Sequence, residues 1–143
     1  MSDVKDQKKE EKFLEMESNW KRALADYKNL EKRVVEEKSI LVEFANSVLV
    51  EQLLPVLDNF EKLEEHTSDE GLKMCVKEYR NTLENAGLEE IKIGKGVKFD
   101  PEIMDAIETK KGKGNKVLEI KRKGYKFKGK LIRPISVVVA KGE

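Results

Sequence analysis

A stripe of apolar residues with heptad spacing dominates the first third of the chain and restricts what it can fold into. From Phe13 to Val48 the apolar positions alternate in steps of three and four residues, with the charged Glu37 occupying one slot. This alternation is the rhythm of a coiled-coil helix. No proline or glycine precedes Pro55, and Lys, Glu, Arg and Asn fill most positions between the apolar ones, which suits an exposed helix face. The stripe consists of Phe13, Met16, Trp20, Ala23, Tyr27, Leu30, Val34, Leu41, Phe44 and Val48.

A narrow stripe on one helix needs a second surface to bury it. With a rise of about 1.5 Å per residue, about 35 residues form a rod roughly 50 Å long, and helix propensity alone does not stabilise such a rod. A second copy of the same chain is the simplest partner, so we predict that residues 11–47 form a dimerising helix. The alternative is a long single helix attached to a globular domain. Phe13, Leu24 and Val35 also fit an 11-residue spacing, so the handedness of any supercoil stays open.

Residues 48–87 predict two helices with an apolar face wider than the stripe. Pro55 removes a backbone donor, so we expect a kink or a restart of the helix there. The segment HTSDEG is typical of a loop, after which Ser68 or Asp69 can cap the second helix and Gly87 can end it. We interpret Gly71 as a structural residue that allows a turn or a close approach of helices. Doubled by dimerisation, two helices per chain would supply a four-helix bundle.

Short β-branched runs separated by glycines predict a small β domain over residues 88–143. A domain of about 50 residues is marginally stable by itself, so we expect it to pack on the bundle. Residues 1–10 are polar and are expected to form a disordered tail. The predicted fold class is therefore α+β, with a long N-terminal coiled-coil-like helix, short helices that form a four-helix bundle in the dimer, and a small C-terminal β domain.

The charge of the chain is divided between its two parts. Residues 1–90 carry 14 Lys and Arg against 22 Asp and Glu, whereas residues 91–143 carry 15 against 6, so the net charges are −8 and +9. Seven of the positive residues fall in the strip KRKGYKFKGKLIR, residues 121–133, where Tyr125 and Phe127 interleave with them. Such a strip could follow a nucleic-acid backbone while its rings stack on bases, bind an acidic protein surface, or form a solvated lysine face. The residues alone leave these three interpretations open.

Residue types that serve catalysis or metal binding are sparse. The single histidine, His66, lies in a polar loop, and the single cysteine, Cys75, lies in a predicted helix, so neither belongs to a zinc-ligand pattern. The segments GKGVKF and KKGKGN do not match phosphate-binding loops, and no set of nucleophile and base is visible. We therefore predict that the protein is not an enzyme and uses no cofactor and no metal.

The N-terminus does not have the composition of a targeting segment. It lacks the apolar core of a signal peptide and carries acidic residues that transit peptides avoid. No uninterrupted apolar run approaches the roughly 20 residues that span a bilayer. We therefore expect a cytoplasmic protein that is not inserted in a membrane.

Three blocks of sequence, in order and with consistent spacing, resemble one known family. They are RALADYKNLEKR (residues 22–33), LLPVLDNFEK (residues 53–62), and the combination of GLEEI, GVKFDPEIMDAI and KGYKFKGKLIRPISVVV in the last third of the chain. Together they resemble the GrpE family, the nucleotide exchange factor of the DnaK chaperone, from about Trp20 to Ala140. Each block alone is weak, and the three together are specific.

The resemblance implies a parallel homodimer with paired long helices, a four-helix bundle and a compact β-wing at the end of each chain. It also implies a co-chaperone of the stress response, whose wing binds the ATPase domain of DnaK and opens the nucleotide cleft so that ADP leaves. The sequence departs from the family pattern at Met104 and Asp105, where a His-Glu or His-Gln pair is usual, and at Lys130, where arginine is common. These departures concern the partner contact and not the family.

With this resemblance, a protein partner becomes the favoured interpretation of the basic strip, whose charge would steer the encounter with an acidic lobe. Arg133 precedes Pro134, so it could equally be a strand-end residue that bonds locally. The alternative function is a nucleic-acid-binding coiled-coil protein with a basic β domain. The predicted residues of the wing contact are Phe99, Pro101, Met104, Lys130, Arg133 and Val139.

Overall fold

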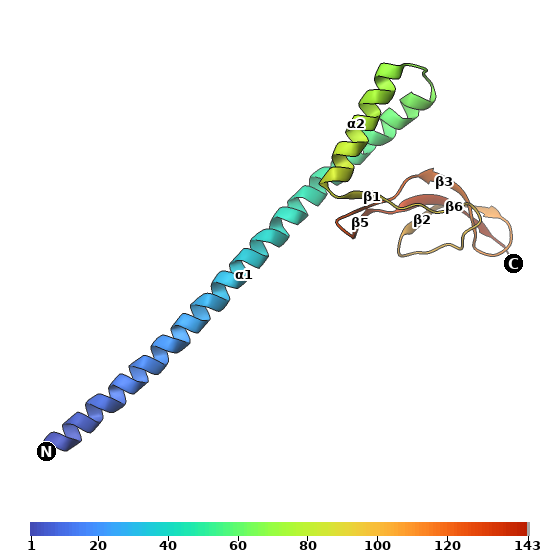
Figure 1. Cartoon of the computed structure of the whole chain (residues 1–143). Coiled ribbons are helices and arrows are strands. Elements are labelled where there is room, and N and C mark those ends of the chain that lie inside the picture. Colours follow the sequence, from blue (N-terminus) through green and yellow to red (C-terminus); the bar gives the residue numbers. More distant parts are fainter. Residues whose placement is uncertain (143) are drawn as a thin grey trace. The chain divides into compact units, whose positions relative to one another are not determined.

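The computed structural model describes residues 1–142 and confirms the predicted α+β class. The elements follow one another as a long helix, a second helix and six strands (Figure 1). The chain divides into two compact units, with the boundary between Phe44 and Ala45. The elements are α1 (Ser2–Glu65), α2 (Glu70–Ala86), β1 (Leu88–Glu90), β2 (Met104–Lys111), β3 (Val117–Arg122), β4 (Tyr125–Phe127), β5 (Lys130–Arg133) and β6 (Ile135–Lys141).

The first unit is the N-terminal part of α1. The helix begins at Ser2, whereas the sequence predicts a disordered tail over residues 1–10. Lys, Glu and Gln, which fill much of this segment, are good helix formers, so the long helix extends through it with its side chains exposed. The large apolar residues of the stripe are between 38% (Val48) and 71% (Met16) exposed, so a single chain leaves the stripe uncovered.

The second part of α1 runs through Pro55 without ending. Of the two expectations at this proline, a kink or a restart, the restart is wrong, because α1 continues to Glu65. Proline lacks the N–H that would bond to the carbonyl four residues earlier, and packing on one side holds the helix together across this gap. That packing comes from Val50, Leu54 and Leu57, the buried residues of α1.

Helix α2 starts and stops where the sequence predicts. The Asp69 side chain accepts hydrogen bonds from the N–H groups of Gly71 (2.7 Å) and Leu72 (3.2 Å), so Asp69 and not Ser68 is the cap. Gly87 ends the helix in the left-handed conformation, with φ of 120°. A Cβ atom on Gly71 would lie 3.1 Å from the capping carboxylate, which places this glycine in the turn that starts α2.

The six strands form two three-stranded sheets. The first sheet has the order β1-β4-β5 and is antiparallel, and the second has the order β2-β6-β3, in which β2 runs parallel to β6. The first sheet and the two helices share one core. The buried residues of this core are Val50, Leu54, Leu57, Leu83, Leu88, Tyr125 and Phe127. The second sheet has its own core, whose buried members are Met104, Val117, Ile135, Val137 and Val139.

Candidate partner-binding surface

A tight turn before β2 carries two of the predicted contact residues. The Asp100 side chain accepts a hydrogen bond from the Glu102 N–H at 3.0 Å, and its carbonyl accepts one from the Met104 N–H at 2.9 Å. These bonds hold Pro101 at the exposed tip of the turn. Phe99 is half-buried against the core of the second sheet and keeps part of its ring exposed. The turn therefore offers a small, preorganised apolar surface.

Two further predicted contact residues lie beneath this surface. Met104 and Val139 are members of the core of the second sheet, and both are nearly fully buried. Met104 pairs with Ile135 and Val139 pairs with Thr109, so both side chains are fixed by the strands around them. They support the surface from within, and a direct contact by either one stays a prediction.

A basic hairpin joins β4 to β5. Its two-residue turn, Lys128–Gly129, has φ values of 46° and 82°, which is the geometry favoured in tight hairpins. The Lys128 N–H donates to the Gly87 carbonyl at 2.9 Å, so the hairpin is attached to the C-terminal end of α2. Lys130, a predicted contact residue, is exposed at the start of β5. The turn thus holds two lysine side chains on the surface.

Arg133 is buried and bonds locally, which is one of the two interpretations that the sequence leaves open. Its guanidinium donates to both carboxylate oxygens of Asp58, at 2.6 and 2.8 Å. It also donates to the Lys123 carbonyl at 2.8 and 3.0 Å and lies 5.2 Å from the centre of the Tyr125 ring. With its donors used in this way, Arg133 is occupied within the chain.

The basic strip is partly neutralised by the chain itself. Lys121 pairs with Glu119 at 2.8 Å, Lys123 pairs with Glu61 at 3.1 Å, and Arg133 pairs with Asp58. Over residues 1–142, the cations of the strip that form no ion pair are Arg122, Lys126, Lys128 and Lys130. Most of the charge that remains for a partner therefore lies on the β4–β5 hairpin.

The aromatic residues of the strip do not face solvent. Tyr125 and Phe127 are each 3% exposed and belong to the core that joins the first sheet to the helices. Burial also raises the pKa of Tyr125 well above its ordinary value. Neither ring is free to stack on a nucleic-acid base, so of the two features that favoured nucleic-acid binding only the positive charge is left.

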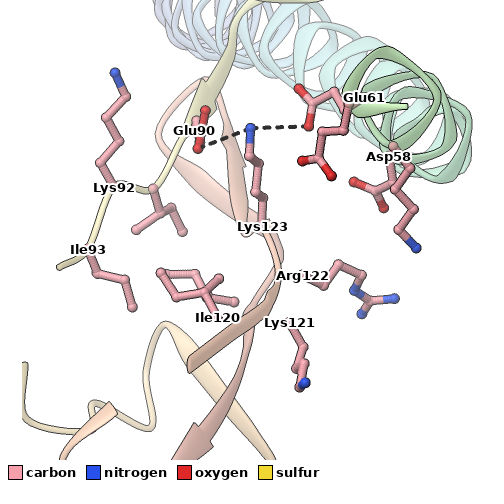
Figure 2. Close-up of a pocket in the computed structure, with 13 residues that line it drawn as sticks. Asp58, Glu61, Glu90, Lys92, Ile93, Ile120, Lys121, Arg122 and Lys123 are labelled. Carbon is pink, nitrogen blue, oxygen red and sulfur yellow. Dashed lines mark ion pairs between the residues drawn. The ribbon is translucent and has the colours of Figure 1, made fainter. Parts of the chain in front are cut away.

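Two acidic residues of α1, to which the sequence alone assigns no role, bind two cations of the basic strip. Asp58 and Glu61 lie one turn apart on α1 and pair with Arg133 and Lys123. They line one side of a cleft of about 620 Å³, whose other side includes Ile120 and Lys121 of β3 (Figure 2). The i, i+3 spacing of the two carboxylates beside an apolar helix face was the only sequence signal for their role. Their partners could not be identified from sequence, because they are 62 and 75 residues away.

The remaining reactive residues do not gather into a site. Cys75 is exposed on α2. In the part of the chain that the structure describes, no group of three or more His, Cys, Asp or Glu side chains is placed to hold a metal ion.

One stretch of α1 has the length and composition of a membrane-crossing helix. This stretch is strongly apolar over the length of a membrane span, and little of it is buried within the chain. Inspection of uninterrupted apolar runs misses this stretch because Glu43 and Glu51 interrupt the apolar residues of this part of the helix. Length and composition are weak criteria, because a soluble helix that is covered by a partner meets them equally well.

Comparison with known proteins finds the family that the three sequence blocks resemble. The family model described as GrpE matches residues 2–141. Protein GrpE of Thermotoga neapolitana is 38% identical over 120 residues, which are 78% of this chain and 70% of the relative. Protein GrpE of Latilactobacillus sakei is 34% identical over 140 residues, which are 92% of this chain and 71% of the relative.

Other relatives are longer than this chain. Protein GrpE of Corynebacterium efficiens is 36% identical over 137 residues, which are 94% of this chain but 57% of the relative. The chain spans 64 to 70% of the length of the Thermotoga relatives. The match nevertheless includes both the long helix and the β domain, with every strand of the two sheets inside it. The chain therefore belongs to the GrpE family.

Proposed function

We propose that this protein is a co-chaperone that binds the ATPase domain of a DnaK-type chaperone, opens its nucleotide cleft and accelerates the release of ADP. The observation that carries the proposal is the family match over residues 2–141, which includes the helices and the β domain together. The exposed basic hairpin and the apolar Asp100 turn supply a surface of suitable chemistry on the β domain.

The proposed activity needs no covalent step. A protein that binds the open ATPase domain more tightly than the closed one lowers the affinity for ADP by thermodynamic linkage. The residues of the surface therefore have to bind and orient a partner, and none has to act as an acid, base or nucleophile.

We propose that the six predicted contact residues act in two ways. Phe99, Pro101 and Lys130 touch the partner directly, because they keep exposed surface. The buried residues Met104, Arg133 and Val139 hold that surface in place. The unpaired lysines of the hairpin steer the encounter with an acidic lobe, an effect that weakens as salt is added.

We also propose that the protein is a parallel homodimer and works in the cytoplasm. The exposed stripe from Phe13 to Val48 gives the reason for dimerisation, because an apolar seam of this length is unfavourable in water. A second copy placed in parallel would align equal slots of the stripe and bury the apolar stretch of α1 without a membrane.

Stopped-flow release of a fluorescent ADP analogue from DnaK tests the proposed function. We expect the release rate to rise with protein concentration to a plateau, with no ATP hydrolysis by the protein alone. Lys130→Glu should raise the half-saturating concentration, whereas Lys77→Glu on the exposed side of α2 should not. No acceleration at saturating protein would refute the proposal, and salt-sensitive binding to RNA or DNA in the same preparation would replace it with the alternative function.

A further inference from the structure

Two short crossings connect the sheets, and an ion pair attaches each of them, or the strand end beside it, to α1. The β3–β4 crossing consists of Lys123 and Gly124, and the β5–β6 crossing is Pro134, directly after Arg133 at the end of β5. The second sheet, which carries the Asp100 turn at its edge, is joined to the first sheet through these crossings and through the 91–103 segment. The contacts that fix the crossings therefore determine the orientation of the second sheet relative to the first sheet.

The first attachment is the pair between Asp58 and Arg133. Both carboxylate oxygens accept from the guanidinium, and the side chains are 17% and 7% exposed. Two parallel bonds between planar groups fix the angle between them as well as the distance. The remaining donors of Arg133 bond to the Lys123 carbonyl, so the same guanidinium ties one crossing to the other.

The second attachment is the pair between Glu61 and Lys123. Figure 2 shows the Lys123 amino group between Glu61 of α1 and Glu90 of β1, at distances of 3.1 and 3.7 Å. The other oxygen of Glu61 accepts from Arg80 of α2 at 2.8 Å. Glu61 therefore connects α2, α1 and the β3–β4 crossing through a single carboxylate.

The crossings also touch each other closely. A Cβ atom on Gly124 would lie 2.5 Å from the Ile135 side chain and 2.7 Å from the Ile135 nitrogen. The two backbones are thus in direct contact at the point where the ion pairs attach. The four side chains Asp58, Glu61, Lys123 and Arg133 are named the crossing clamp here.

A buried ion pair such as that of Asp58 with Arg133 often adds little net stability, because desolvation offsets its attraction. The pair of Glu61 with Lys123, whose lysine side chain is 42% exposed, adds little because solvent screens it. Their geometric demand is a better explanation for their presence, since apolar packing alone tolerates rotation more easily than a bidentate pair does. The apolar core of the first sheet and the helices already attaches that sheet to the helices. The clamp acts at the connection between the two sheets, because the second sheet has a separate core that does not include the helices.

We propose that Asp58 and Glu61 are positioning residues, which act through Arg133 and Lys123 to hold the second sheet in the orientation that the partner binds. This inference rests on the proposed function. Neither acidic residue has to touch the partner for this role. Loss of the clamp lets the second sheet sample several orientations. The apparent affinity for the partner is then multiplied by the fraction of molecules in the binding-competent orientation.

The orientation can be measured on the full chain without any partner. Spin labels on the native Cys75 of α2 and on Thr109→Cys of β2, both exposed, report the distance between the helices and the second sheet. Labelled chains diluted into an excess of unlabelled chain give mainly distances within one chain. We expect a narrow distribution in the parent protein and a broadened or shifted one in Asp58→Asn, in Lys123→Met and in their combination.

Arg80→Met is the matched control. It also removes one ion pair from Glu61, but it leaves the bond between Glu61 and the β3–β4 crossing in place. Its distance distribution should stay narrow. If Asp58→Asn and Lys123→Met leave the distribution as narrow as Arg80→Met does, the positioning role is refuted.

A variant that keeps the fold separates orientation from stability. Asp58→Leu combined with Arg133→Met replaces the pair by apolar groups of similar size, an exchange that is often neutral or stabilising. We expect thermal unfolding at an equal or higher temperature together with a broadened distance distribution. An unchanged distribution in this folded variant would also overturn the inference.

Nucleotide release distinguishes failure of the clamp from failure of the proposed function. For Asp58→Asn we expect the half-saturating concentration to rise about threefold to tenfold while the plateau rate is unchanged. If the parent protein does not accelerate ADP release, the proposed function fails, and the distance measurement still decides whether the clamp exists. If the parent accelerates release and Asp58→Asn is indistinguishable from it in both measurements, only the clamp is refuted.

Discussion

Residues 1–44 and the unit that begins at Ala45 differ in where they place their apolar side chains. In the first unit the stripe residues are exposed, Trp20 and Tyr27 by more than half, and the ion pairs are exposed pairs within the helix, such as Lys21 with Glu17. In the second unit lie all the buried apolar residues of the described chain, from Val50 to Ala140. The comparison shows that the second unit has a core of its own, whereas the apolar stripe of the first unit is not covered by any part of the described chain.

This difference predicts that the two units respond to different perturbations. Substitutions in the stripe should change association and leave the core of the second unit intact. Substitutions in the core should lower the stability of the second unit and leave the stripe unchanged. The following tests are ordered from the largest expected effect to the smallest.

Charges in the stripe should have the largest effect. Leu30→Asp combined with Val34→Asp would place two carboxylates in the predicted seam, and we expect the dimer dissociation constant to rise at least about a hundredfold. Sedimentation measures the association, and circular dichroism should show a loss of helix as the stripe loses its cover. Lys32→Asp, outside the stripe, is the control. A double variant that associates as well as this control would contradict the contrast between the units.

Truncation in the core should affect only the second unit. Leu54 is fully buried between α1 and the first sheet, so Leu54→Ala should lower the free energy of unfolding by about 2–4 kcal/mol. Urea denaturation of the full chain measures this loss. Leu41→Ala, at an exposed stripe position, should change the association and not the unfolding of the β domain. Equal effects of the two variants on the β domain would show that the units are not separate.

The crossing between the sheets should be less tolerant than a hairpin tip. Gly124→Ala would force a methyl group against the Ile135 backbone, and we expect a loss of about 1–3 kcal/mol. At Gly129 a Cβ would meet no atom within 4 Å, so Gly129→Ala should cost only the strain of its φ of 82°, about 1 kcal/mol. Thermal unfolding of both variants gives the comparison. A Gly129→Ala variant that is the less stable of the two would reverse the prediction.

The cap of α2 should have the smallest effect. Asp69→Ala removes the acceptor of two backbone N–H groups and should lower the stability by about 1 kcal/mol. Ser68→Ala should change it by a few tenths of that amount, because Asp69 and not Ser68 is the cap. Chemical denaturation of the two variants checks the assignment, and a larger loss in Ser68→Ala would contradict it.

Much of the architecture could be predicted because it depends on local pattern. The heptad spacing predicts the long helix, Ser68 or Asp69 and then Gly87 mark the ends of α2, and the runs separated by glycines predict the strands. The prediction for residues 1–10 differed from the structure because polarity alone does not separate a solvated helix from a flexible tail. The expected restart at Pro55 is wrong for a related reason, since tertiary packing on one face of α1 decides whether the helix continues through a proline.

The candidate surface could be predicted only in part. The positions of Pro101 and Lys130 on turns and hairpins follow from local sequence, so their exposure was foreseeable. The burial of Tyr125 and Phe127 was not, because an alternating strand does not reveal which of its faces meets a helix. The pairing of Arg133 with Asp58 was equally hidden, because the two residues are 75 positions apart.

By itself the sequence determined the succession of elements, the ends of α2, the apolar stripe and the family, because each depends on residues that are near one another or on their order along the chain. Only the tertiary structure decided which cations of the basic strip stay free and how the second sheet is attached to α1. The physical reason is that a cation of the strip is neutralised by a carboxylate within a few ångströms of it. Asp58 and Glu61 come that close to Arg133 and Lys123 only after the chain has folded.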